Sequence, residues 1–271
     1  MKILFVADIF ARPGRRAAAE QIPLLIRDRQ VDLVIANAEN AAGGFGLTQN
    51  IVGKLHSYGA DVITSGNHIW DRREFVGYLQ QTDRVLRPLN YPAEVAGIGS
   101  TIASSRSGVQ VGVINLQGRT SMTSIDCPFR AGRAEIERLK QQTPILFVDF
   151  HAEATAEKMA LAWYLDGLAT AVIGTHTHVQ TADERILPQG TAYLTDAGMT
   201  GPHDSVIGVR QDIAIERFLT QVPIRFKPAE ENVKFCGVLI DVDPASGRSL
   251  AIERLQIDLQ FSGGGSNDSD D

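Results

Sequence analysis

Carboxylate, amide and imidazole side chains recur just after short apolar runs in this sequence. Asp8 follows the apolar run 3–7, for example, and His151 follows the run 145–148. If these runs are strands of an open α/β sheet, their carboxyl ends share one edge, which is where ligands bind in such sheets. Mixed oxygen and nitrogen ligands suit a pair of metal ions, which favours metal-assisted phosphoester hydrolysis. The candidate set is Asp8, Glu39, Asn40, Asn67, His68, His151, His176 and His178.

The charges of these residue types suit an anionic substrate. Asp8 and Glu39 contribute two negative charges, whereas the asparagines and neutral histidines contribute none. Two divalent ions with a bridging hydroxide would therefore leave the site net positive, and a phosphoester would be attracted to it. We expect Glu39 to bridge the ions, which two-metal sites hold about 3.5–4 Å apart.

The ligand types also restrict the metal. Three imidazoles argue against calcium, and against magnesium alone, because both ions prefer oxygen ligands. Iron, manganese and zinc remain, and the choice among them depends on geometry and availability.

Two short motifs suggest separate roles for the histidines. His176 and His178 are two residues apart, so in an extended segment they point the same way and can reach neighbouring metals. His68 follows Asn67, and an imidazole near the metals but not bound to them could protonate the leaving oxygen. Asp71 could orient that imidazole or could cap a following helix, and the sequence favours neither role.

Apolar runs alternate with helix-type stretches along most of the chain. The strands are continuous and apolar, as expected when both faces of a sheet are covered. Two irregular stretches, 116–131 and 196–210, are rich in glycine, proline or arginine and could either shape a pocket or simply connect elements. The predicted strands are 2–7, 32–36, 61–64, 98–104, 109–115, 145–149, 170–174, 191–195, 233–242 and 249–258, and the predicted helices are 15–29, 48–57, 72–80, 156–166 and 211–220.

Composition narrows the class of protein further. The chain has 271 residues, 44% hydrophobic, which is enough for one domain over 1–258, with a disordered acidic Gly/Ser tail at 259–271. The formal net charge is -6, and no basic tract offers a face for duplex nucleic acid. Two distant cysteines form no disulfide framework, and we find no signal peptide or membrane-spanning segment. These features predict a cytoplasmic protein.

The motifs, taken in order, resemble those of the calcineurin-like metallophosphoesterase superfamily. Gly66-Asn67-His68 and His176-x-His178 match its pattern, and His151 fits its lone histidine. Phe10 stands where the first motif of that superfamily has a histidine, and 37–40 (Asn-Ala-Glu-Asn) places a glutamate where its bridging aspartate would be. These departures are similar to the bacterial YmdB-type branch over roughly residues 1–257.

The resemblance implies a fold and an activity. The fold would be an α/β sandwich of four layers, α-β-β-α, with mixed sheets. The activity would be hydrolysis of small cyclic nucleotides, 2′,3′-cyclic and also 3′,5′-cyclic AMP, by a metal-held hydroxide. The cofactor would be two divalent or trivalent ions, iron first, with manganese and zinc as alternatives.

By position, the resemblance also implies roles for the residues. Asp8 and His178 would bind one ion, with Asn40 as a further ligand, and Glu39 would bridge the two. The other ion would be held by Asn67, His151 and His176, and His68 would be the acid near the leaving group.

Two alternatives stay open at this point. One is a phosphomonoesterase or nuclease that uses the same metals. The other is a regulatory protein that senses cyclic nucleotides or metal with little turnover. The sequence leaves the oligomeric state, including a homo-oligomer, undecided.

Overall fold

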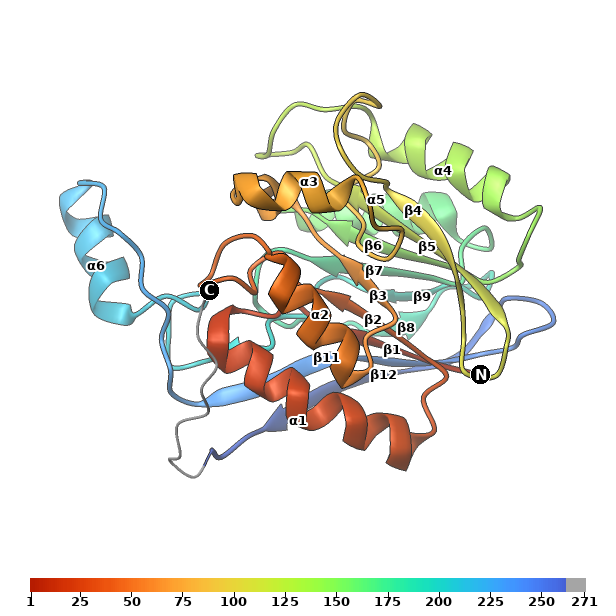
Figure 1. The fold of residues 1–271 in the computed structure, drawn as a ribbon. Coiled ribbons are helices and arrows are strands. Elements are labelled where there is room, and N and C mark those ends of the chain that lie inside the picture. Colours follow the sequence, from red (N-terminus) through yellow and green to blue (C-terminus); the bar gives the residue numbers. More distant parts are fainter. Residues whose placement is uncertain (262–271) are drawn as a thin grey trace.

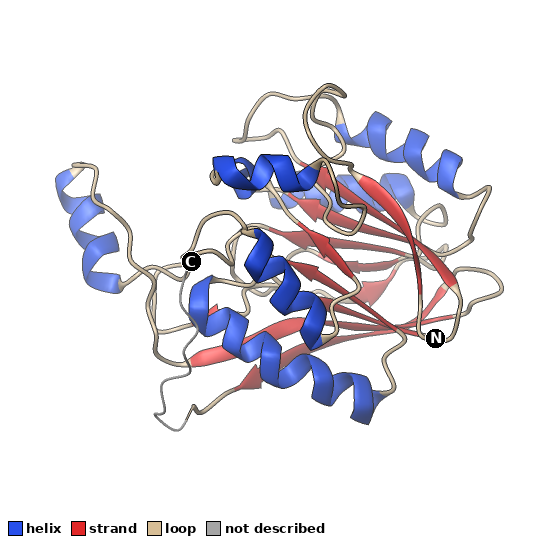
Figure 2. Ribbon diagram, viewed as in Figure 1, coloured by secondary structure: helices blue, strands red, loops and turns tan. Residues whose placement is uncertain are grey.

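The computed structural model describes residues 1–261, which form two six-stranded sheets and their covering helices (Figures 1 and 2). The strands are β1 (Lys2–Val6), β2 (Leu33–Asn37), β3 (Val62–Thr64), β4 (Ser100–Ser104), β5 (Gln110–Gln117), β6 (Leu146–His151), β7 (Ala171–Thr175), β8 (Arg185–Ile186), β9 (Ala192–Leu194), β10 (Gly201–Pro202), β11 (Val233–Val242) and β12 (Ser249–Asp258). The helices are α1 (Ala11–Arg29), α2 (Gln49–Tyr58), α3 (Val76–Leu79), α4 (Pro128–Leu139), α5 (Thr155–Leu165) and α6 (Gln211–Thr220), with 3₁₀ turns η1 (Asn67–Trp70) and η2 (Arg73–Phe75).

The first sheet has the strand order β10-β11-β1-β2-β3, and β12 also pairs with β11. Strands β1, β2 and β3 are parallel, whereas β11 runs antiparallel to β1. The second sheet has the order β4-β5-β6-β7-β9-β8, in which β5, β6, β7 and β9 are parallel. Each sheet therefore has a run of parallel strands whose carboxyl ends lie at one edge.

Alternate residues of each strand enter different cores. Phe5 of β1 and Phe147 of β6 meet between the sheets, with ring centroids 5.2 Å apart. Leu4 packs on the other face of its sheet with α1 and α2, and Val148 packs with α4 and α5 on the other face of the second sheet. Because both faces of the central strands β1, β2, β6 and β7 are covered, these strands are almost entirely apolar, whereas β4 and β12 are partly exposed and carry polar residues. The predicted four-layer α-β-β-α sandwich with mixed sheets is confirmed.

Several elements differ from the sequence prediction. The helix predicted at 72–80 is instead η2 followed by the single turn α3. No helix was predicted at 128–139, where α4 begins with Pro128 in its first turn, a favoured position for proline. The predicted loop 116–131 is correspondingly shorter, and 196–210 contains the two-residue strand β10.

The C-terminal end of the described chain packs on the body. The backbone amide of Leu259 donates to the carbonyl of Val233, and the Arg16 guanidinium lies 4.0 Å from the centre of the Phe261 ring. The rest of the tail predicted to be disordered, 262–271, lies outside the described residues. Within 1–261 no helix combines the length and apolar character needed to cross a membrane.

Candidate metal centre

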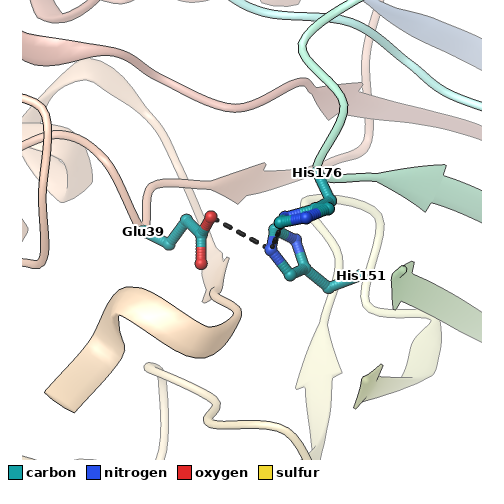
Figure 3. A group of neighbouring side chains, drawn as sticks. All are labelled: Glu39, His151 and His176. Atoms are coloured by element: carbon teal, nitrogen blue, oxygen red, sulfur yellow. Dashed lines mark hydrogen bonds and ion pairs between the residues drawn. The ribbon is translucent and has the colours of Figure 1, made fainter. Parts of the chain in front are cut away.

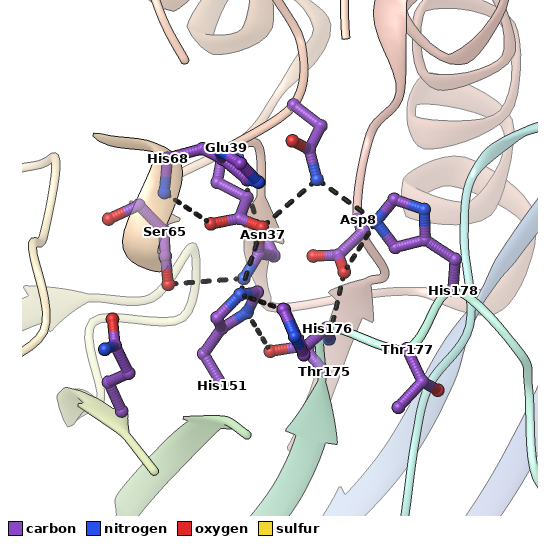
Figure 4. Close-up of polar contacts among 12 residues, drawn as sticks. Asp8, Asn37, Glu39, Ser65, His68, His151, Thr175, His176, Thr177 and His178 are labelled. Atoms are coloured by element: carbon purple, nitrogen blue, oxygen red, sulfur yellow. Dashed lines mark hydrogen bonds and ion pairs between the residues drawn. The ribbon is translucent and has the colours of Figure 1, made fainter. Parts of the chain in front are cut away.

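The predicted site residues lie at or just beyond the carboxyl ends of parallel strands from both sheets. Asp8 follows β1, Glu39 follows β2, and Asn67 begins η1 after β3. His151 is the last residue of β6, and His176 directly follows β7. Figure 4 shows residues from both sheets converging on one place, so the grouping predicted from the sequence is present.

One part of the centre consists of Glu39, His151 and His176. One atom from each can be chosen so that all three lie within 4.8 Å of one another (Figure 3). Glu39 Oε1 lies 3.0 Å from His151 Nε2, and His176 Nδ1 lies 3.0 Å from the same nitrogen. Both His151 and Glu39 are fully buried. A buried carboxylate against two imidazoles is a ligand set suited to a transition metal.

The other part consists of Asp8, Asn40 and His178. Asp8 Oδ2 lies 3.5 Å from His178 Nε2, and Asn40 Nδ2 lies 3.1 Å from both His178 Nε2 and Glu39 Oε1. Asn40 therefore joins the two parts through Glu39. Direct metal binding requires the amide oxygen of Asn40 rather than its nitrogen. Rotating the amide by a half-turn would place Oδ1 where Nδ2 now lies, facing Glu39 and His178.

Two buried oxygen atoms in this place, Asp8 Oδ1 and Asn67 Oδ1, have no hydrogen-bond partner among residues 1–261. A buried acceptor without a partner is costly, by about 1–3 kcal/mol, and a cation would satisfy it. Gly66 keeps the space open, because a Cβ there would lie 2.1 Å from His151 Cδ2 and 2.3 Å from Glu39 Oε2. The residues present therefore fit bound metal ions.

The pKa values of the buried groups show how strongly they interact. Burial raises the pKa of Asp8 well above its usual value. Burial also disfavours the charged form of Glu39, but His151 outweighs it and lowers the pKa of Glu39 to about 2. Burial alone would lower the pKa of His151, but the neighbouring Glu39 carboxylate raises it to about 9. Burial lowers the pKa of His176 to about 3. A positive charge is thus held beside Glu39, where a cation would also be stabilised.

The rings of His151 and His178 are held by hydrogen bonds at Nδ1, the nitrogen that faces away from the site. The groups that make these bonds were not among the residues predicted from the sequence. His151 Nδ1 lies 2.9 Å from Thr175 Oγ1, which donates to Asp149 Oδ1 at 2.8 Å. A hydroxyl that donates to a carboxylate must accept from the ring, so Nδ1 carries the hydrogen and Nε2 faces the site. Similarly, His178 Nδ1 lies 2.8 Å from the carbonyl of Ile207. A lone aspartate in the buried apolar run 146–150 was the signal for Asp149.

His68 lies at the rim and is not part of the buried cluster. Its side chain is 30% exposed, and its Nδ1 lies 2.8 Å from Asp71 Oδ2. Its ring packs edge-on against Phe45, with centroids 5.1 Å apart. Asp71 therefore orients the imidazole, while the following 3₁₀ turn has Arg72 at its N-cap position. The sequence left open whether Asp71 orients the imidazole or caps a helix, and in the structure it orients the imidazole.

The loop that carries His176 and His178 has an uncommon backbone conformation. Both residues have positive φ, 104° and 65°. Asp196 holds the residue between them, because its Oδ2 accepts from the amide and the hydroxyl of Thr177 at 3.1 and 2.8 Å. Asp196 also forms a 2.6 Å ion pair with Lys158, and both side chains are buried. Positive φ in non-glycine residues costs about 1–3 kcal/mol and persists only where surrounding contacts enforce it.

Phe10, which stands where the resemblance would place a histidine, is buried against the centre. Its ring meets His178 edge-on, with centroids 5.7 Å apart. It is also enclosed by glycines, since Cβ atoms at Gly44 and Gly208 would lie 3.1 and 2.6 Å from it. An apolar ring thus occupies this position and supplies no ligand.

Comparisons with known proteins agree with this geometry. The family described as YmdB-like protein matches residues 4–255. A 2′,3′-cyclic-nucleotide 2′-phosphodiesterase from Bacillus subtilis (strain 168) is 47% identical over 257 residues, which cover 95% of this chain and 97% of that protein. A crystal structure of a hypothetical protein from Thermus thermophilus superimposes with a TM-score of 0.89 at 42% identity and covers 95% of this chain and 99% of that one. A novel phosphatase from Mycoplasma pneumoniae gives a TM-score of 0.88 at 34% identity, with coverages of 95% and 93%.

The sandwich and its cluster of carboxylate, amide and imidazole groups define a metallophosphoesterase, a class that works with divalent metal ions. Within this superfamily the chain belongs to the YmdB-like family, and it is a hydrolytic phosphoesterase.

Proposed function

We propose that this phosphoesterase hydrolyses small cyclic nucleotides, with 2′,3′-cyclic nucleotides as the main substrates and 3′,5′-cyclic AMP as a further one. The observation that carries this proposal is the buried cluster of ligand-type side chains beside His68. Within residues 1–261, Asp8 Oδ1 and Asn67 Oδ1 of this cluster have no hydrogen-bond partner, and Asp71 orients the His68 ring at the rim. The substrate class is supported by the name of the Bacillus subtilis relative.

In the proposed centre, two groups of side chains would hold two metal ions. Asp8, Asn40 and His178 would hold one ion, and Asn67, His151 and His176 would hold the other. Glu39 contacts both groups and would bridge the ions. Such ions, with iron first and manganese or zinc as alternatives, would supply Lewis acidity toward the phosphate and activation of the attacking water.

His68 would act on the leaving group. Because Nδ1 faces Asp71, Nε2 is the nitrogen that can give a proton to the departing ribose oxygen. Asp71 would stabilise the imidazolium before transfer, and the edge contact with Phe45 limits rotation of the ring.

Replacing the bridge tests the metal centre. We expect Glu39→Gln to reduce kcat at least about 100-fold while the fold survives, because the neutral amide cannot bridge two cations. Steady-state rates at saturating Mn²⁺ and circular dichroism measure the two effects. Glu94→Gln, at an exposed position, is the matched control. Full activity of Glu39→Gln at saturating Mn²⁺ would end the assignment.

A phosphomonoesterase is the second candidate, because the Mycoplasma pneumoniae structure is described as a phosphatase. A panel of 4-nitrophenyl phosphate, 2′,3′-cyclic AMP, 3′,5′-cyclic AMP and single-stranded DNA separates these activities. We expect the highest kcat/KM with 2′,3′-cyclic AMP. A clear preference for the monoester, or for DNA, would replace the proposed function.

A further inference from the structure

An apolar pocket lies between α6 and the segment that returns from it. Its volume is about 430 Å³, within the usual range for a small-molecule site. Its lining includes Ile207, Val209, Arg217, Phe218, Gln221 and Phe226. Figure 1 shows α6 standing away from both helix layers. None of the roles described so far uses this pocket.

One wall of the pocket is attached to the metal centre. The carbonyl of Ile207 accepts from Nδ1 of His178 at 2.8 Å. The turn around it is closed by two backbone hydrogen bonds between Val206 and Val209, of 2.8 and 3.0 Å. Gly208, with φ of +98°, lies directly against Phe10. The pocket therefore has a fixed position relative to His178.

Another lining residue, Phe226, connects the pocket to His68. Phe226 stacks on Phe45 with centroids 6.3 Å apart, and Phe45 in turn meets the ring of His68. The pocket is thus connected to His178 through Ile207, and to His68 through Phe226 and Phe45. A substrate whose phosphate lies between His178 and His68 could place the rest of its structure there.

We propose that this pocket binds the nucleobase of the substrate, an inference that rests on the proposed function. The exposed ring of Phe218 offers aromatic surface for stacking, which contributes about 1–3 kcal/mol per base, and Phe226, packed between Phe45 and Arg217, forms the wall beside it. The Arg217 guanidinium lies 4.6 Å from the centre of the Phe226 ring, and Gln221 adds an amide that can bond to the edge of a base. Among the described residues, no carboxylate lines the pocket to repel the nearby phosphate. A flat, nitrogen-rich ring fits these walls better than a sugar or a charged group does.

The test compares two substrates that differ only in the base. 2′,3′-cyclic AMP and ribose 2′,3′-cyclic phosphate are supplied to the metal-loaded enzyme, and hydrolysis of both is followed by phosphorus NMR. We expect Phe226→Leu and Arg217→Met each to lower the ratio of kcat/KM for the nucleotide to that for the ribose phosphate about tenfold. Arg217 is exposed, so its variant tests the inference even if Phe226→Leu fails to fold. Leu219→Ala, on the same helix but outside the pocket lining, should leave the ratio unchanged.

Calorimetric titration with adenosine separates the pocket from the proposed function. We expect adenosine to bind the wild-type enzyme and to bind both variants about tenfold more weakly. If the wild type fails to hydrolyse 2′,3′-cyclic AMP, the proposed function falls, and the adenosine titration still decides the pocket. No binding of adenosine, or equal binding by all variants, overturns the inference. Phe218 is 74% exposed, so it could also contact a second copy of the chain. If Phe218→Ala lowers the mass measured by light scattering but leaves adenosine binding unchanged, this surface is an interface between copies. That result would also overturn the proposed nucleobase site.

Discussion

Four histidines of the same chemistry lie in two kinds of environment. His151, His176 and His178 have their rings turned toward carboxylates, and two of them are fixed through Nδ1 by Thr175 and by the carbonyl of Ile207. His68 instead lies at the rim with Nδ1 held by Asp71. Fixed rings facing carboxylates suit ligands, whereas an accessible imidazole with a carboxylate partner suits a proton donor.

This difference predicts a dependence on the leaving group. His68→Ala should lower kcat for 2′,3′-cyclic AMP by about 100-fold or more, because the ribose oxygen leaves only with a proton. The loss should be much smaller with bis(4-nitrophenyl) phosphate, whose nitrophenolate leaves unprotonated. Parallel kinetics on both diesters measure the contrast, with His56→Gln as a control in α2, where the ring bonds to the carbonyl of Ala60. Equal losses on both diesters would argue against an acid role, and unchanged turnover with altered nucleotide affinity would favour the sensing protein.

At the scale of elements, the loops after β3 and β7 determine the shape of the centre. The loop after β3 passes so close to His151 and Glu39 that only glycine fits at 66. The loop after β7 keeps two histidines at positive φ through contacts with Asp196. Both loops depend on groups contributed by other strands.

Gly66→Ala should displace His151 and weaken metal binding at least about tenfold, since the added methyl overlaps the imidazole. Gly53→Ala is the matched control, because a Cβ there in α2 meets nothing within 4 Å and should be neutral or stabilising by up to about 1 kcal/mol. Titration of chelator-treated protein with Mn²⁺ measures the affinity. Equal affinities in the two variants would contradict the steric argument.

Lys158 and Asp196 form a buried pair whose disruption should be severe. Lys158→Met leaves an unpaired buried carboxylate and should reduce the free energy of unfolding by about 3–5 kcal/mol. Adding Asp196→Asn removes that charge, so the double variant should recover part of the loss. Urea denaturation of the wild type, both single variants and the double variant measures the coupling. Strictly additive losses would show that the two side chains do not depend on each other.

Across the whole molecule, two sheets bring buried negative charge to one place. Asp8, Glu39, Asp149 and Asp196 are all buried there, and Lys158 pairs with one of them. Burial raises the pKa of Asp149 to about 6, although Thr64, Thr175 and Asn37 donate to it. Buried charge without partners opposes folding, and bound cations would offset it.

Metal removal should therefore lower the melting temperature, and metal addition should restore it, because an ion that binds only the folded state stabilises it. The pKa of His151 is about 9, so this ring is protonated at neutral pH unless a metal displaces the proton. Metal affinity should consequently rise with pH, by up to about tenfold per unit, until the pH approaches that pKa. Thermal melts and Mn²⁺ titrations of chelator-treated protein, from mildly acidic to mildly basic buffers, measure both effects. An affinity independent of pH would contradict metal binding at His151.

The sequence by itself determined the longer strands, most of the helices and the residues that gather at the centre, but not the two-residue strands β8 and β10. Continuous apolar runs mark strands covered on both faces, and ligand-type side chains after such runs share an edge whenever the strands are parallel. It did not reveal α4 or the short turns at 73–79, where local preference is weak and packing decides the conformation.

Tertiary structure alone decided which groups hold the site residues in place. Asp149 reaches His151 through Thr175 of a neighbouring strand, and Asp196 reaches Thr177 from beyond β9. The apolar run around Asp149 marks that residue as unusual, but no local pattern shows which side chains Asp149 and Asp196 contact. A side chain carries its chemistry wherever it stands, but its protonation, ring orientation and access to solvent are set by neighbours that only the folded chain brings close.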